Sequence, residues 1–381
     1  MKKIVLIPDS FKGTLSSIQI CGIMENKIKE HYPSCEVISI PVADGGEGSV
    51  DCFLRAMGGK RVFATVKNPY FEDIEVFYGI VEEGQTAVIE MASCAGLPLV
   101  EERKNPSKTT TYGVGQLMLD AASKGVKKII VGLGGSATND GGCGAAAAVG
   151  VKFINTKGER FIPRGETLHQ IAHIDRSEGN KILENIEIVT MCDIDNPMYG
   201  PEGASHVFAP QKGADLEMVL FLEEGMRHLA EVIRADLGQD IAFIPGTGAA
   251  GAMGAGMIAF FHAALKMGID TVLDTVRFDD IISNTDMIFT GEGRIDCQSL
   301  RGKVVLGIAK RAKDKGVPVI AVVGGAEKDI DEVYDRGVTS VFSINRLPEA
   351  FEISRHSSEE NVALTMDNIL RLIKHVERMK A

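Results

Sequence analysis

The chain has 381 residues, of which 45% are apolar and 24% charged, a composition typical of folded proteins and not of disordered ones. Its 41 Lys and Arg residues against 52 Asp and Glu residues give a net charge of −11, which argues against an extended surface for nucleic acid or an anionic membrane. The length suggests two or three domains.

Short runs of β-branched residues alternate with amphipathic stretches along most of the chain. The first strands are predicted at 4–7 and 36–40, with helices at about 15–31 and 48–57. The pattern then changes, because strand-like runs at 61–67, 74–81 and 86–91 follow one another closely and predict an antiparallel segment. Further helices are predicted near 109–124, 143–149, 215–235, 302–315 and 358–379, and further strands at 128–131, 187–190, 287–290, 318–323 and 339–344.

Continuous apolar strands between helices predict an α/β fold with parallel sheets covered on both faces. The change of pattern near residue 60 indicates a second α/β domain at 63–261, inserted into a discontinuous domain formed by 1–62 and 262–381. Residues 241–265 contain no charged side chain, but they are rich in Gly and Ala and poor in Leu. We therefore expect a buried glycine loop and helix there, not a membrane span.

The seven cysteines are scattered, odd in number and without a CxxC pair, which predicts reduced thiols in the cytoplasm. The apolar run after the first three residues is too short for a signal peptide. We expect no membrane and no nucleic-acid partner, and the oligomeric state stays open.

Glycine is unusually frequent, with 42 residues in the chain. Seven segments combine glycine with polar residues at or near predicted strand ends: 9–13, 44–48, 132–142, 192–213, 245–251, 291–296 and 324–325. Ligands of parallel α/β sheets bind at the carboxyl ends of the strands, and glycine there lets backbone N–H groups approach an anion. Together the segments predict a shared site at this edge.

The residues GLGGSA at 132–137 match the G-x-G-x-x-A pattern of dinucleotide-binding turns. The acidic residue expected about 20 positions later is not obvious, and the chain has no G-x-x-x-x-G-K-[ST] loop. The motif is therefore interpreted as a phosphate-cradling loop that opens onto the Ala-rich helix.

The same segments hold the carboxylates Asp9, Asp44, Glu47, Asp140, Asp193, Asp195, Glu292 and Asp296. Carboxylates without His or Cys favour magnesium, which binds together with substrate phosphates. Cations lie in or near these segments at Lys12, Lys212, Arg294 and Lys303. A backbone cradle, a metal, cations and a carboxylate base are what phosphoryl transfer requires.

At this point the chain resembles a known family, the bacterial type I glycerate kinases. The resemblance is carried by PDSFKG (8–13), ADGGEGS (43–49), GLGGSATNDGG (132–142), CDIDNPMYGPEGA (192–204), APQKGA (209–214), GAAG (248–251) and TGEGRID (290–296). It implies a two-domain α/β enzyme, one domain Rossmann-like and the inserted one flavodoxin-like, with the active site in the cleft between them. It also implies ATP- and Mg²⁺-dependent phosphorylation of D-glycerate in glyoxylate or related organic acid metabolism, with precedent leaning to 2-phosphoglycerate.

Roles for single residues are hypotheses. The ATP phosphates are assigned to four residues whose N–H and hydroxyl groups can wrap an anion: Gly134, Gly135, Ser136 and Thr138. The metal is assigned to Asp44 and Glu47. Asp193 is the first choice for general base, because it follows a strand and lies beside Asn196, and Asp296 is the second choice.

Cations are needed for the carboxylate of glycerate or for the transferred phosphoryl group. Lys12 and Arg294 are assigned to the catalytic set, since Arg suits bidentate binding of a carboxylate. The substrate-binding candidates are Asp9, Ser10, Lys212 and Asn196.

Two other functions stay open from the residues alone. The G-x-G-x-x-A turn allows a nucleotide-dependent dehydrogenase of a small hydroxy acid, which NADH fluorescence would reveal. A non-catalytic sensor of a sugar acid is the second alternative, although a sensor needs no metal-type carboxylates.

Overall fold

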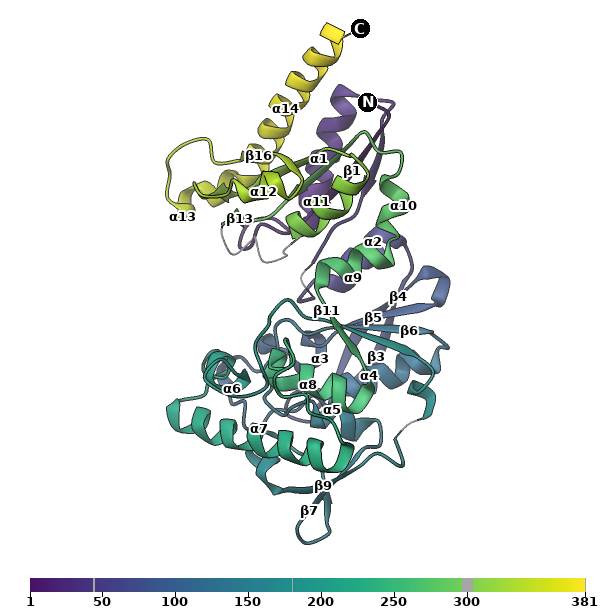
Figure 1. Ribbon diagram of the computed structural model, residues 1–381, viewed down its shortest axis with the longest axis vertical. Helices are drawn as coiled ribbons and strands as arrows, with labels where there is room; N and C mark the ends of the chain where they lie inside the picture. Colours follow the sequence, from purple (N-terminus) through teal and green to yellow (C-terminus); the bar gives the residue numbers. More distant parts are fainter. Residues whose placement is uncertain (44, 180, 297–303, 381) are drawn as a thin grey trace. The chain divides into compact units, whose positions relative to one another are not determined.

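A computed structural model describes residues 1–43, 45–179, 181–296 and 304–380. The chain forms two compact units (Figure 1). Unit 1 comprises Met1–Ala43, Arg55–Met57 and Ile269–Ala381, and unit 2 comprises Asp44–Leu54 and Gly58–Gly268. The predicted boundaries at 62/63 and 261/262, and an active site between two domains, remain predictions. Each unit is described by itself below.

Unit 1 is built on a five-stranded parallel sheet in the order β16-β14-β12-β1-β2. Its strands are β1 (Lys3–Pro8), β2 (Glu36–Ser39), β12 (Met287–Gly291), β14 (Val319–Val323) and β16 (Val338–Ser343). If the five strands are renumbered 1 to 5 in chain order, the sheet reads 2-1-3-4-5 from its β2 edge, which is the strand order of flavodoxin-like folds. Like a Rossmann sheet it is parallel and doubly wound, and among the described residues β2 is its edge strand.

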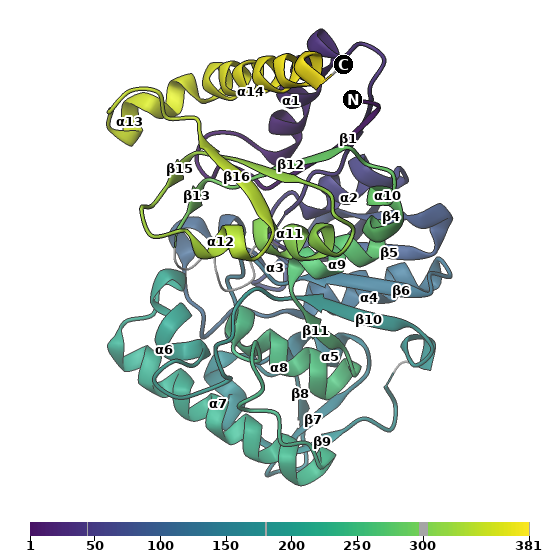
Figure 2. The ribbon, with the colours of Figure 1, turned by 45° about the horizontal axis from the view of Figure 1, so that its top comes forward.

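The strands of this sheet are apolar on both faces, as the continuous runs predicted. Ile320 and Val322 of β14 pack in one core cluster, with residues of α1 (Ser17–His31) and α14 (Ser358–Lys380). Ala321 and Val323, which alternate with them, pack in a second cluster with α11 (Val304–Asp314) and α12 (Glu332–Asp335). Figure 2 shows the sheet between these two helical layers.

Shorter elements complete unit 1. Most of α9 (Gly268–Thr275) and all of α10 (Phe278–Ile282) and α13 (Phe351–Ser354) belong to it. Two short strands, β13 (Arg294–Ile295) and β15 (Gly325–Ala326), pair in parallel just after β12 and β14.

Unit 2 contains a six-stranded sheet in the order β11-β10-β6-β5-β4-β3. Its strands are β3 (Lys60–Lys67), β4 (Asp73–Val81), β5 (Thr86–Glu90), β6 (Lys128–Gly132), β10 (Glu187–Met191) and β11 (Ala264–Lys266). The predicted antiparallel segment is confirmed for β3, β4 and β5, whereas β5, β6, β10 and β11 pair in parallel.

Helices pack against this sheet around one large apolar core that includes the uncharged stretch. The helices of unit 2 are α2 (Ser49–Met57, up to Leu54), α3 (Ala92–Ala95), α4 (Tyr112–Ser123), α5 (Cys143–Ala148), α6 (Ala204–Phe208), α7 (Leu216–Leu237) and α8 (Ala249–Phe261). A separate antiparallel sheet is formed by β7 (Lys152–Asn155), β8 (Arg160–Phe161) and β9 (Ile171–Asp175). It packs against this core, where the rings of Phe153 and Phe260 make an edge-to-face contact with their centroids 5.6 Å apart. Within the described residues, no helix is both long enough and apolar enough to cross a membrane.

Candidate functional site

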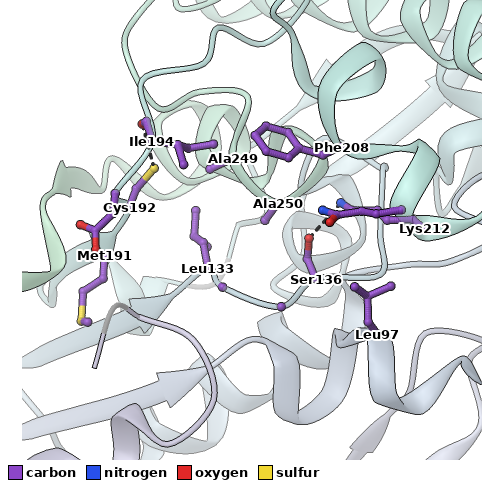
Figure 3. A pocket seen from close by; sticks show the side chains of 14 residues that line it. Leu97, Leu133, Ser136, Met191, Cys192, Ile194, Phe208, Lys212, Ala249 and Ala250 are labelled. Atoms are coloured by element: carbon purple, nitrogen blue, oxygen red, sulfur yellow. Dashed lines mark hydrogen bonds between the residues drawn. The ribbon is translucent and has the colours of Figure 1, made fainter. Parts of the chain in front are cut away.

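A pocket of about 300 Å³ lies at the carboxyl ends of β6 and β10 in unit 2. Its walls come from the loops after these strands, the turn at Pro210–Lys212 and the start of α8. Figure 3 shows Lys212 and Ser136 on one side of it and Met191, Cys192 and Ile194 on the opposite side. The pocket therefore occupies the strand edge that the glycine segments predicted.

The glycine loop after β6 contributes Gly134, Gly135 and Ser136 to the lining. The Gly134 N–H donates to the carbonyl of Gly45 at 3.0 Å, and a Cβ at Gly134 would lie 2.5 Å from the Cα of Gly46. Gly134 is thus required where two loops cross closely. The loop is held by backbone contacts before any ligand binds.

Lys212 is the main surprise of the pocket, because it is buried, with only 1% of its surface exposed. Its Nζ donates to the Ser136 hydroxyl at 2.9 Å and to the Thr138 carbonyl at 2.6 Å. Burial lowers the pKa of Lys212 from 10.5 to about 7, although the negative charge of Asp140 acts to raise it. The sequence made Lys212 a substrate-binding candidate but gave no sign of this buried environment.

Thr138, the fourth predicted phosphate ligand, is fully buried and does not line the pocket. Its carbonyl binds Lys212, and its hydroxyl has no hydrogen-bond partner among the described residues. The structure therefore places Thr138 behind Lys212, away from the pocket lining.

Asp140 is buried and binds the backbone of neighbouring segments. Its carboxylate accepts hydrogen bonds from the Thr111 N–H at 2.7 Å and hydroxyl at 2.9 Å, and from the N–H groups of Gly142 and Gly144. Burial raises the pKa of Asp140, while these donors favour its ionised form. Asp140 thus fixes the end of the glycine loop to the starts of α4 and α5.

Asp193 lines the pocket two residues after β10 and is exposed. One of its carboxylate oxygens accepts a hydrogen bond from the Gly268 N–H at 2.6 Å, which fixes its orientation. Asn196 instead donates to the carbonyl of Glu202 at 2.8 Å within its own loop and is not part of the lining. Asp193 and Asn196 therefore have different hydrogen-bond partners, and a substrate-binding role for Asn196 stays a prediction.

The start of α8 closes the pocket with a left-handed turn. Ala250, Gly251 and Ala252 have φ angles of 56°, 67° and 62°, a conformation that costs free energy for alanine. Ala249 and Ala250 line the pocket, together with Leu97, Phe208 and Gln211, which the sequence did not single out. Strained backbone of this kind concentrates at functional sites.

The sequence assigned the metal to Asp44 and Glu47. Asp44 lies outside the described residues, and Glu47 is exposed and absent from the pocket lining. The described residues contain no group of three His, Cys, Asp or Glu side chains placed to hold a metal. Mg²⁺ usually binds through one or two carboxylates plus phosphates, so the assignment of the metal to Asp44 and Glu47 stays a prediction.

The remaining predicted residues lie in unit 1. The Asp9 N–H donates to the carbonyl of Gly291 at 2.8 Å, and the Ser10 N–H donates to the Asp9 carboxylate at 2.6 Å. Lys12 and Arg294 line a second pocket of about 300 Å³, and Asp296 does not. Arg294 forms an ion pair with Glu327.

Comparison with known proteins gives consistent results. The model of the glycerate kinase family matches residues 4–374. The glycerate kinase of Bacillus cereus is 44% identical over 373 residues, 98% of each chain, and the glycerate 2-kinase of Escherichia coli is 40% identical over 96% of this chain and 98% of its own. A crystal structure of a putative glycerate kinase 2 from Salmonella typhimurium LT2 superposes with a TM-score of 0.88 at 38% identity, covering 99% of both chains. These likenesses confirm the predicted resemblance and the α/β class.

Proposed function

Because the chain belongs to the glycerate kinase family and is a kinase, we propose that it transfers the terminal phosphoryl group of ATP to D-glycerate with Mg²⁺. The proposed product is 2-phosphoglycerate, in organic acid or glyoxylate metabolism. The name of the Escherichia coli relative, glycerate 2-kinase, supports the choice of the 2-hydroxyl.

The observation that carries this proposal is the buried Lys212 at the glycine loop. Its amine is held by Ser136 and Thr138 at a pocket that Asp193 also lines. Phosphoryl transfer depends on positioning and on stabilising charge, and a buried cation acts more strongly than a solvated one. The pocket therefore combines an amine for phosphate oxygens with a carboxylate for the attacking hydroxyl.

In this proposal, the phosphates of ATP contact Gly134, Gly135 and Ser136, and Lys212 neutralises developing charge. Thr138 contributes by orienting Lys212 through its carbonyl. Asp193 accepts the proton of the glycerate hydroxyl, and its hydrogen bond from Gly268 holds it ready for that step. Mg²⁺, when bound, neutralises phosphate charge.

The other assignments remain proposals. Lys12 and Arg294 neutralise substrate charge, and Asp296 is the second candidate base. Asp9, Ser10 and Asn196 are kept as substrate-binding candidates, and Asp44 and Glu47 as metal candidates. The cytoplasm is the proposed compartment, supported by buried free thiols at Cys35, Cys94, Cys143 and Cys192.

The proposal is tested by ADP release from ATP in a coupled assay with the purified protein. We expect turnover that requires both D-glycerate and Mg²⁺ and stops when EDTA is added. ATP hydrolysis at the same rate without D-glycerate, or no ADP release with it, would count against the proposal.

A further inference from the structure

Two side chains of opposite charge, Lys212 and Asp140, are buried beside the glycine loop that follows β6 in unit 2. The Lys212 Nζ is 2.6 Å from the carbonyl oxygen of Thr138, and Asp140 follows Thr138 by two residues. The hydrogen bonds of both charged groups go to neutral partners, so neither charge is cancelled by direct contact. Buried charges are screened less than exposed ones, and each of the two therefore acts on the other through the protein.

The Asp140 carboxylate is held by five neutral hydrogen-bond donors. The N–H and hydroxyl of Thr111 donate at 2.7 and 2.9 Å, the N–H groups of Gly142 and Gly144 at 3.1 and 3.2 Å, and the Thr110 hydroxyl at 3.4 Å. Such donors favour the ionised form of a carboxyl group, against the burial that raises the pKa of Asp140. Because none of these donors is charged, the negative charge of Asp140 remains able to act on a cation nearby.

Lys212 keeps one hydrogen-bond donor for a ligand. A protonated lysine has three N–H donors, and two of them bind the Ser136 hydroxyl and the Thr138 carbonyl (Figure 3). The third has no acceptor among the residues that the structure describes, and Lys212 lines the pocket after β6. A deprotonated amine would lose one of these hydrogens and the positive charge. Binding of an anionic oxygen by Lys212 therefore depends on its protonation.

The surroundings of Lys212 decide whether it is protonated. Burial lowers its pKa to about 7, and the charge of Asp140 acts in the opposite direction. The other titratable side chains among the described pocket residues are Cys192 and Asp193, both from the segment after β10. Burial raises the pKa of Cys192 to about 11, so its thiol is neutral at pH 7. Asp193 is exposed, so water screens its charge more than that of Asp140.

We propose that Asp140 is a positioning residue of the kinase site, whose carboxylate keeps the Lys212 amine protonated for the phosphate oxygens. Asp140 is fully buried and does not line the pocket, so it acts on the phosphates through Lys212 alone. This inference rests on the proposed function, in which Lys212 neutralises developing charge. It gives Asp140 a second task beside its anchoring of the glycine loop.

Two variants separate the charge of Asp140 from its anchoring bonds. Asp140→Asn removes the charge. Thr111→Val is the matched control, because it keeps that charge and removes the hydroxyl that donates to Asp140 at 2.9 Å. Circular dichroism verifies that both variants fold, and kcat/KM for ATP is measured from pH 6 to pH 8.

The expected result depends on pH, because the protonated fraction of an amine falls tenfold for each pH step of one above its pKa. Relative to wild type, we expect Asp140→Asn to lower kcat/KM for ATP about 10-fold or more at pH 8, but only about twofold at pH 6. The ratio of Thr111→Val to wild type should be the same at both pH values. Loss of anchoring alone would not give this dependence on pH.

Carbon-13 NMR of protein labelled at the lysine ε-carbon measures the Lys212 titration directly and needs no turnover. The Lys212 signal is assigned by its loss in Lys212→Met. Its titration midpoint should move to lower pH in Asp140→Asn and stay in place in Thr111→Val. A lowered midpoint in a protein that releases no ADP would overturn the proposed kinase reaction and not the action of Asp140 on Lys212.

An unmoved midpoint in Asp140→Asn, or a rate ratio that is equal at pH 6 and pH 8, would overturn the inference and leave Asp140 as a loop anchor. If Asp140→Asn does not fold, the wild-type protein decides. The carboxyl carbon of Asp140, assigned through the backbone, should then show an ionised group at pH 7 that responds at the midpoint of Lys212. A protonated carboxyl group, or one that does not respond, would contradict the proposal.

Discussion

At the scale of single residues, Lys212 differs most from what its sequence context suggests. It follows a short helix and a proline, where a lysine is normally solvated. Its burial depends on packing against Ser136 and Thr138, more than 70 positions earlier in the chain. Only the tertiary structure could reveal a long-range contact of this kind.

The burial of Lys212 predicts a specific pH dependence of stability. Its pKa is about 7 in the folded protein and near 10.5 when unfolded, so between these values the unfolded chain binds more protons. The free energy of unfolding therefore gains a contribution that rises with pH above 7, and the cost of the buried charge is fully present below pH 7.

Urea denaturation at pH 7 and pH 9 tests this sign. Over this interval, the free energy of unfolding should rise by about 2 kcal/mol more in wild type than in Lys212→Met. Equal pH dependence in the two proteins would show that Lys212 does not titrate in this range.

Asp193 is the second residue with a direct prediction. If its carboxylate accepts the hydroxyl proton, Asp193→Asn should lower kcat by about 10²–10⁴-fold, with a smaller change in KM for ATP. Asp195→Asn is the matched control, because Asp195 is exposed and outside the pocket lining. Turnover of Asp193→Asn within a few fold of the control would remove Asp193 as the base.

At the scale of elements, strand and helix positions followed well from the sequence where burial was continuous. The strands at 4–7, 128–131 and 287–290 appear as β1, β6 and β12 with small changes at their ends. The sheet at 152–175 was not predicted, because its strands are only two to five residues long and contain few buried residues. A flavodoxin-like sheet differs from a Rossmann sheet in its strand order, and hydrophobic periodicity in the sequence does not reveal that order.

Several of the glycine segments follow strand ends, as predicted, and the structure shows what packs against some of their glycines. In unit 2, Gly134 permits close crossing of loops, and Gly251 permits another. Sequence patterns place such glycines at a strand end but do not show what approaches them. The role of each glycine therefore required the structure.

The left-handed turn at the start of α8 provides a prediction at this scale. A Cβ on Gly251 would lie 2.0 Å from the Thr138 carbonyl, the same group that binds Lys212. Gly251→Ala should therefore lower the free energy of unfolding by about 2 kcal/mol or more and also raise KM for ATP. Gly22→Ala, in an open helical position, should instead stabilise by about 0.5–1 kcal/mol. Equal stability of the two variants would contradict this account of the turn.

At the scale of the whole molecule, the family resemblance predicted the function more specifically than the residue chemistry alone did. The motifs run from PDSFKG (8–13) to TGEGRID (290–296), and the family match over residues 4–374 includes all of them. The candidate site was predicted in part: Gly134, Gly135, Ser136, Asp193 and Lys212 line one pocket, and Lys12 and Arg294 line another. Some predicted residues line neither pocket, because their positions depend on loop conformations that spacing does not determine: Asp9, Ser10, Glu47, Thr138, Asn196 and Asp296.

The most direct test of the central claim is the proton-coupled phosphorus NMR spectrum of the product formed from ATP and D-glycerate. A phosphate on the 2-oxygen neighbours one carbon-bound proton and gives a doublet, whereas a phosphate on the 3-oxygen neighbours two and gives a triplet. We predict a doublet that grows in step with ADP. A triplet would contradict the assignment of the 2-hydroxyl, and the absence of any new phosphate ester would contradict the proposed kinase reaction itself.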